Sequence, residues 1–155
     1  MDLPPPQAAL YNREILRLAA SIPHSGRLEA PDSSAQRTSP ICGSRVTVDV
    51  GLDSAGYIAR FGQEVRACAL GQASAAILGR HVVGETAESI AEARDLLRGW
   101  LKGEGGLPPR LAERFPELAL FEPARAHPAR HPSILLAFEA TAAAAAEARV
   151  PVGQG

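Results

Sequence analysis

Two segments of the chain alternate between apolar and polar residues, which is the pattern of half-buried β-strands. In Arg45–Leu52 the three valines and the final leucine fall on one face, and residues 57–65 resume the alternation after an Asp-Ser-Ala-Gly turn at 53–56. Two strands joined by a short glycine-bearing loop predict an antiparallel hairpin. We therefore expect a small antiparallel sheet of about three strands.

Apolar residues recur at helical spacing in four other segments. Pro23 ends the first of these helices, and Thr86 can cap the third, with Ser89 as its capping partner. Residues 28–37 are polar and follow neither period, so we expect them to be irregular. The predicted helices cover residues 10–22, a segment that begins at or just after Cys68, residues 86–102 and residues 133–149.

This order of elements predicts an α+β fold, in which a helix precedes the sheet and several helices pack on one of its faces. We expect a single domain over residues 10–149, with a disordered lead at 1–9 and a tail at 150–155. Residues 107–132 contain six of the 13 prolines. They are expected to form a long insertion with short helical turns, such as 110–114.

The composition argues against several classes of function. The chain has 155 residues with a net charge of −1 and 5% aromatic residues, which does not favour nucleic acid as a partner. No stretch of 18 apolar residues predicts a membrane span, and the N-terminus lacks the pattern of a secretory signal. The two cysteines are therefore expected to be reduced, and the protein to be cytoplasmic.

The two cysteines are the first candidates for chemistry. Cys42 stands in a Ser-Pro-Ile-Cys-Gly-Ser segment at 39–44, and Cys68 stands where a helix is expected to begin. The N-terminus of a helix favours a thiolate, and thiolates bind soft metals or accept sulfur. Each cysteine has about even odds of being a small buried core residue instead. The separation of 26 positions between the two cysteines does not by itself indicate a metal site.

Other residue types give weaker signals. His127 and His131 precede the last predicted helix, and they are the only nitrogen ligands that we retain as candidates. No phosphate-binding loop follows a strand, and no segment resembles the strand–turn–helix motif of a serine nucleophile. The acidic residues are scattered, mostly on predicted helix faces, and are interpreted as solvated surface.

Several motifs together resemble the U-type iron–sulfur cluster assembly scaffolds, which include NifU amino-terminal domains, IscU and SufU. The segment at 39–44 is similar to the family's Asn-Pro-x-Cys-Gly-Asp, and Cys68 with the Ala-Leu-Gly-Gln-Ala-Ser that follows is similar to its second cysteine motif. The separation of the cysteines also agrees. The insertion at 107–132 and the Arg-His-Pro-Ser that begins at 130 look like the SufU branch.

In these families three cysteines and an aspartate hold zinc or a nascent cluster, so the resemblance implies a site at Cys42 and Cys68. Ser44 stands at the position of the aspartate, and Ser133 stands at that of the third cysteine. A neutral hydroxyl is a poor ligand beside a thiolate or carboxylate. The resemblance therefore implies an iron–sulfur cluster or zinc held by two thiolates.

The remaining ligands could come from His127 or His131, from a second subunit or from a partner, or they could be absent. The resemblance implies an assembly scaffold or sulfur acceptor rather than an enzyme, working with a cysteine desulfurase and other cluster-assembly proteins, with Cys42 slightly preferred as acceptor. A second hypothesis is a metal-free interaction or regulatory protein of the same pathway. A third is a redox pair, in which Cys42 and Cys68 form a reversible disulfide.

Overall fold

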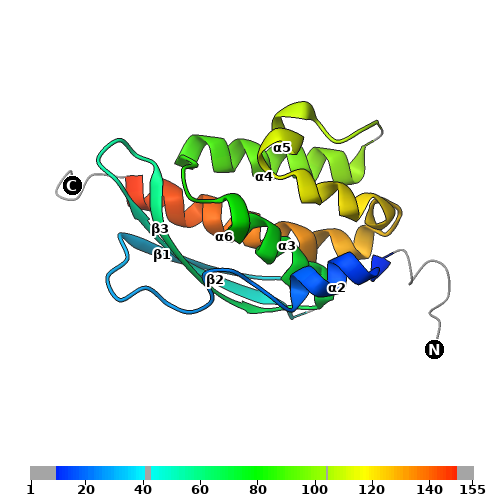
Figure 1. The fold of residues 1–155 in the computed structure, drawn as a ribbon, viewed down its shortest axis with the longest axis horizontal. Coiled ribbons are helices and arrows are strands. Elements are labelled where there is room, and N and C mark those ends of the chain that lie inside the picture. Colours follow the sequence, from blue (N-terminus) through cyan, green and yellow to red (C-terminus); the bar gives the residue numbers. More distant parts are fainter. Residues whose placement is uncertain (1–9, 41–42, 104, 150–155) are drawn as a thin grey trace.

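A three-stranded antiparallel sheet is covered on one face by helices in the computed structural model, which describes residues 10–40, 43–103 and 105–149 (Figure 1). The predicted α+β fold is confirmed. The elements are α2 (Arg13–Ala19), β1 (Ser33–Thr38), β2 (Arg45–Leu52), β3 (Ile58–Arg66), α3 (Ala69–His81), α4 (Ala87–Lys102), α5 (Pro109–Arg114), η1 (Pro116–Ala126), η2 (Pro128–Arg130) and α6 (His131–Arg149).

The sheet has the order β1-β2-β3, so β2 is the central strand. Val46, Val48 and Val50 of β2 are buried on the face that carries the helices. The turn at 53–56 joins β2 to β3, as the alternation predicts, and the N–H of Gly56 donates to the carbonyl of Asp53. The hairpin prediction is therefore confirmed.

β1 corrects the prediction of irregular structure for residues 33–37, whereas residues 28–32 form neither helix nor strand, as predicted. It pairs antiparallel with β2 along its whole length, from Ser33 opposite Val50 to Thr38 opposite Arg45. Its sequence, Ser-Ser-Ala-Gln-Arg-Thr, lacks apolar alternation because residues 36–38 are exposed at the edge of the sheet. Backbone pairing with an established neighbour, rather than burial of side chains, makes this segment a strand.

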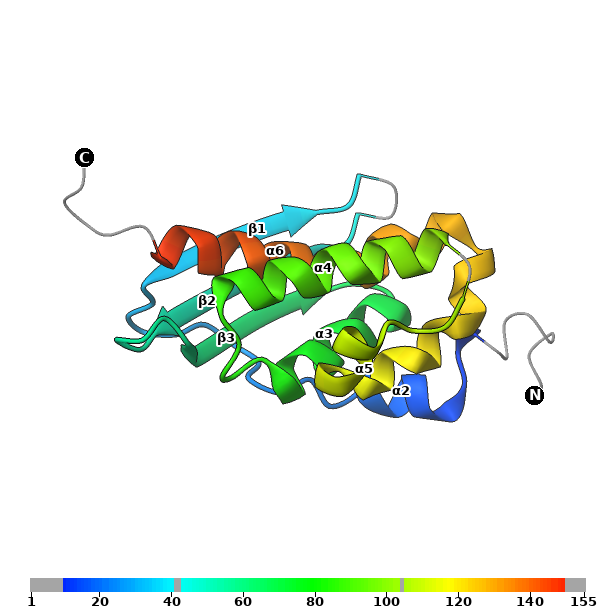
Figure 2. The ribbon, with the colours of Figure 1, turned by 90° about the horizontal axis from the view of Figure 1, so that it is seen from above.

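Helix α6 is the centre of the molecule. It packs against β1 and β2 on one side and against α4 on the other, while α3 lies beside it and α2 packs on α3 (Figures 1 and 2). Its alanine-rich segment is buried on nearly every side, as expected for a helix that is apolar all round. Small side chains let the sheet and α4 both approach its axis.

The ends of two helices show how side chains set boundaries. The helix expected over 10–22 is interrupted at Asn12, whose Oδ1 accepts a hydrogen bond from the N–H of Ile15 at 2.9 Å and caps α2. In α4, Thr86 and Ser89 form a complete capping box, as the sequence predicts. The buried residues of α4 include Ile90, Ala93, Leu97 and Leu101.

The proline-rich residues 107–132 form three short helices, and the expected helical turn near 110–114 is confirmed as α5. Each of the three starts with a proline: Pro109, Pro116 and Pro128. Proline suits this position because its missing N–H would have no partner in the first turn.

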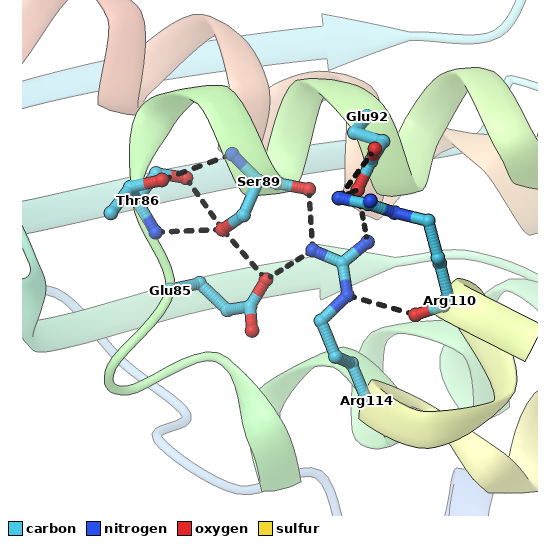
Figure 3. Close-up of polar contacts among 6 residues, drawn as sticks. All are labelled: Glu85, Thr86, Ser89, Glu92, Arg110 and Arg114. Carbon is cyan, nitrogen blue, oxygen red and sulfur yellow. Dashed lines mark hydrogen bonds and ion pairs between the residues drawn. The ribbon is translucent and has the colours of Figure 1, made fainter.

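A cluster around Arg114 fastens α5 to the start of α4 (Figure 3). One guanidinium nitrogen of Arg114 donates to Glu85 Oε1 and to the carbonyl of Ser89, both at 3.0 Å. Another donates to Glu92 Oε1 at 3.2 Å, and Arg110 donates to the same carboxylate. These contacts hold the insertion against the helical layer.

The outer face of the sheet is crossed by residues 24–32, which we call the crossing segment. It first pairs with the edge of β3, where the N–H of Gly26 donates to the carbonyl of Gln63 at 2.8 Å. A side chain at Gly62 would lie 2.7 Å from the carbonyl oxygen of Gly26, so only glycine allows this approach. The segment then passes over β2 to reach β1.

Asp49 corrects the view that the acidic residues are solvated surface, because it is fully buried beneath the crossing segment. Its carboxylate accepts hydrogen bonds from the guanidinium of Arg27 at 2.7 and 3.0 Å, from the N–H of Leu28 at 2.9 Å and from the hydroxyl of Ser34. Burial on its own raises the pKa of Asp49, but these hydrogen bonds, with that of Arg27 first, lower it below its ordinary value.

Candidate functional site

One end of the sheet gathers the polar residues that the sequence singles out. β1 ends there, β2 begins there and β3 ends there, so that Thr38, Arg45 and Arg66 form one row across the three strands. The residues next to this row, Ser39, Ser44 and Ala67, therefore lie together, and the N–H of Ser39 donates to the carbonyl of Ser44 at 2.8 Å. We call this region the site end.

Cys68 lies at the site end, directly after β3. It is the N-cap residue of α3, so the predicted start of a helix at this cysteine is confirmed. Its backbone is extended, and its side chain makes no capping hydrogen bond and is neither fully buried nor fully exposed. Cys68 is therefore partly exposed at the N-terminus of a helix, and it packs against the hydrophobic core.

The start of α6 approaches the start of α3 closely. A Cβ at Gly71 would lie 2.8 Å from the Cβ of Ala67 and 3.2 Å from the carbonyl oxygen of Ser133. One turn further along, the hydroxyl of Ser74 donates to the carbonyl of Ile134 at 2.6 Å. Ser133 thus lies beside the first turn of α3, and Ser44 reaches the same region from β2.

Ser44 and Ser133 are both buried, with 4% and 3% of their surfaces exposed. Cys42 lies outside the described residues. Its described neighbour Gly43 adopts a φ of 72°, a conformation that favours glycine, and its N–H donates to the carbonyl of Ser39 at 2.9 Å. This backbone conformation therefore explains why a glycine follows the cysteine in the Pro-x-Cys-Gly motif.

The two candidate histidines lie at the junction of η1, η2 and α6. His131 is buried, and its Nε2 is 3.1 Å from the carbonyl oxygen of Ala124, while His127 is half-buried just before η2. Within the described part of the chain, no three side chains of His, Cys, Asp or Glu come close enough to hold a metal ion. The donors described at the site end are one thiol and the serine hydroxyls.

Sequence reasoning missed Ser39 as a member of this region. It is 2% exposed, and its Oγ has no hydrogen-bond partner among the residues that the structure describes. The resemblance offered a signal, because Ser39 occupies the position of the family's asparagine in the cysteine motif. The apposition of Arg45 and Arg66 was also missed, since it depends on the register of the strands.

Comparisons with known proteins define the class to which this fold and site belong. No protein-family model and no curated protein matches the chain. Among solved structures, the N-terminal part of a nitrogen-fixing NifU-like protein from Brucella abortus is 36% identical, with a TM-score of 0.80, and the match covers 92% of this chain and 96% of that one. The chain therefore belongs to the family of NifU-like N-terminal domains, which confirms the resemblance noted in its motifs.

Two more distant structures share the fold. A candidate iron–sulfur cluster assembly scaffold protein of the SUF system from the thermophile Fervidobacterium islandicum AW-1 has a TM-score of 0.78 at 20% identity, over 88% of this chain and 97% of that one. A hypothetical protein has a TM-score of 0.77 at 21% identity, over 90% and 98%. No helix in the described residues is long and apolar enough to cross a membrane.

Proposed function

We propose that this protein is an iron–sulfur cluster assembly scaffold or sulfur acceptor, which uses Cys42 and Cys68 and works with a cysteine desulfurase and other cluster-assembly proteins. Membership of the NifU-like family supports the process. The observation that carries the site is the position of Cys68, which is partly exposed at the N-terminus of α3, where the first turn of this helix approaches Ser133 at the start of α6. Reduced thiols of this kind fit a cytoplasmic location.

In the sulfur-acceptor role, a thiolate attacks the outer sulfur of a persulfide on the desulfurase. A new S–S bond forms on the acceptor, the S–S bond of the desulfurase breaks, and its cysteine leaves as a thiolate. The step consumes no external oxidant or reductant. We assign the first acceptance to Cys42, which stands in a turn sequence, and the stabilisation of the bound sulfur or metal to Cys68.

In the scaffold role, the cargo is iron, a nascent iron–sulfur cluster or zinc. Two thiolates are soft ligands that suit all three, whereas the hydroxyls of Ser44 and Ser133 add weak, neutral oxygen donors. A cargo held in this way needs further ligands from His127 or His131, from a partner or from a second copy of the chain. We therefore expect a transient complex rather than a permanently filled site.

The sulfur-acceptor role is tested by persulfide transfer. The protein is incubated with a cysteine desulfurase and cysteine, and persulfides are trapped by alkylation and counted by mass spectrometry. We expect loading of the wild type and loss of loading in Cys42→Ala, with Ser39→Ala as the control that leaves both thiols in place. Unchanged loading in the Cys42→Ala variant would reject the assignment.

A second candidate function is a metal-free interaction protein of the same pathway. The observation that favours it is the burial of Ser44 and Ser133, at the two positions where the resemblance implies charged ligands. Metal analysis after the protein has been loaded anaerobically with iron or zinc and desalted separates the two functions. Stoichiometric iron or zinc that is lost in both Cys42→Ala and Cys68→Ala excludes the metal-free function, and absence of metal from the wild type supports it.

A further inference from the structure

The outer face of the sheet is covered over only half of its length. Arg27 of the crossing segment binds Asp49 beneath it, and the guanidinium of Arg60 lies against Gly51 and donates to the carbonyl of Ala30 at 3.0 Å. Towards the site end, the described residues leave the outer face open. There the side chains form two rows across the strands, with Gln36, Thr47 and Glu64 in one and Thr38, Arg45 and Arg66 in the other.

All of these residues except Thr38 line a groove of about 560 Å³, which the crossing segment borders on one side. We call it the open groove. Most of its lining is polar, and Val65 and Ile22 add a short apolar edge. The polar lining consists chiefly of Ser25, Gln36, Arg45, Thr47, Glu64 and Arg66.

Arg45 and Arg66 stand directly opposite each other on β2 and β3, and both are exposed. Neither has an ion pair or a hydrogen-bonded side-chain partner among the described residues, although the other arginines of this face have one. Like charges that face each other across two strands destabilise a sheet. The fold therefore gains nothing from this pair, and a carboxylate placed between the two guanidinium groups would relieve their repulsion.

Among the described residues that line the open groove, Glu64 supplies the only carboxylate, and it lies one row nearer to the crossing segment. Asp49 is the main cause that raises the pKa of Arg27, and the charge of Glu64 adds to it. The negative charge of Glu64 therefore acts on Arg27 as well as on the two arginines of the groove. The end of the groove that Arg45 and Arg66 form keeps an excess of positive charge.

We propose that the open groove docks an acidic, extended segment of the protein that delivers sulfur to the site end. The inference rests on the proposed function, and the groove ends at Arg66, which stands two positions before Cys68 in the chain. Charge complementarity selects the occupant: two adjacent guanidinium groups match carboxylates spaced along a peptide, and Gln36 and Thr47 offer further hydrogen-bonding groups. The contact sets the orientation of the donor and its rate of association.

The test uses a fluorescein-labelled octaglutamate peptide and the full chain, with binding followed by fluorescence anisotropy at low salt. We expect saturable binding that weakens as salt is added, and about a tenfold loss of affinity in the double variant Arg45→Gln/Arg66→Gln. The variant Arg45→Lys/Arg66→Lys keeps the charge and should stay within about threefold of wild type. Circular dichroism verifies that each variant is folded.

The matched control is Arg13→Gln/Arg37→Gln, which removes the same charge. Arg37 lies at the same end of the sheet but opposite Val46, on the other face, and Arg13 is exposed on α2. We expect the control pair to bind the peptide within about twofold of wild type. Equal losses in both pairs, absence of saturable binding, or equally tight binding of inorganic phosphate would overturn the proposal. Because the peptide assay involves no sulfur or metal, its failure is distinguishable from failure of the proposed function.

Discussion

The two halves of the outer sheet face use arginine in opposite ways. Beneath the crossing segment, Arg27 and Arg60 bind carboxylates and carbonyl groups of the chain itself, and they hold residues 24–32 against the strands. At the site end, Arg45 and Arg66 face each other and are left without such partners in the described structure. The arginines of the covered half stabilise the fold, whereas we propose that those at the site end bind a partner.

The largest expected effect comes from the covered half. Replacing Asp49 with asparagine removes the charge that orders Arg27 and leaves a buried amide beneath the crossing segment. We expect a loss of about 2–4 kcal/mol in the free energy of unfolding, measured by urea denaturation. The matched change in the open half, Glu64→Gln, should stay within about 0.5 kcal/mol. Similar losses for both variants would remove the distinction between the halves.

The same contrast predicts a dependence on pH. The folded-state pKa of Asp49 is lowered, so its stabilising contribution is present above the unfolded pKa of about 4 and is lost as the pH falls through the folded value. The wild type should therefore lose stability more steeply than Asp49→Asn as the pH falls below the unfolded pKa. Parallel curves of unfolding free energy against pH for the two proteins would contradict the assignment.

At the site end, the close approach of α3 and α6 predicts a smaller effect. A methyl group at Gly71 would meet Ala67 and Ser133, so Gly71→Ala should cost about 1–2 kcal/mol although alanine favours helices. Gly99 in α4 has nothing within 4 Å of such a methyl group. Gly99→Ala should therefore stabilise the protein by about 0.5–1 kcal/mol. Thermal unfolding of both variants checks the pair, and a stabilising Gly71→Ala would argue against the apposition.

The smallest expected effect is a gain. Replacing Arg66 with threonine removes one of two like charges that face each other, and it should stabilise the sheet by about 0.2–0.5 kcal/mol. Arg60→Thr should instead destabilise by up to about 1 kcal/mol, because it removes contacts with Ala30 and Asp32. Urea unfolding at low salt measures both changes, which should have opposite signs.

Local patterns in the sequence were enough to predict the hairpin, the start of α3 at Cys68 and the capping box of α4. Each depends on residues a few positions apart, which act through strand alternation or helix capping. β1 and the burial of Asp49 could not be predicted in this way. β1 has no apolar period of its own. Asp49 continues a strand pattern that places it on the outer face, and its burial depends on Arg27 and Leu28, which are distant in the sequence.

The candidate site, too, has features that the sequence predicts and features that depend on packing. The motifs indicated which residues come together, and Cys68, Ser44 and Ser133 are indeed brought to one region by the ends of three elements. The burial of the serines and the contact of His131 with Ala124 depend on packing around α6, which no spacing in the sequence encodes. The role of Cys42 stays a prediction.

Zinc K-edge X-ray absorption of the anaerobically zinc-loaded protein tests most directly whether the two thiols share an ion. The account predicts two sulfur ligands at about 2.3 Å, with oxygen or nitrogen completing the shell, and a fall to one sulfur ligand at most in Cys68→Ser. Zinc without sulfur ligands, or a sulfur signal that is unchanged in Cys68→Ser, would contradict it.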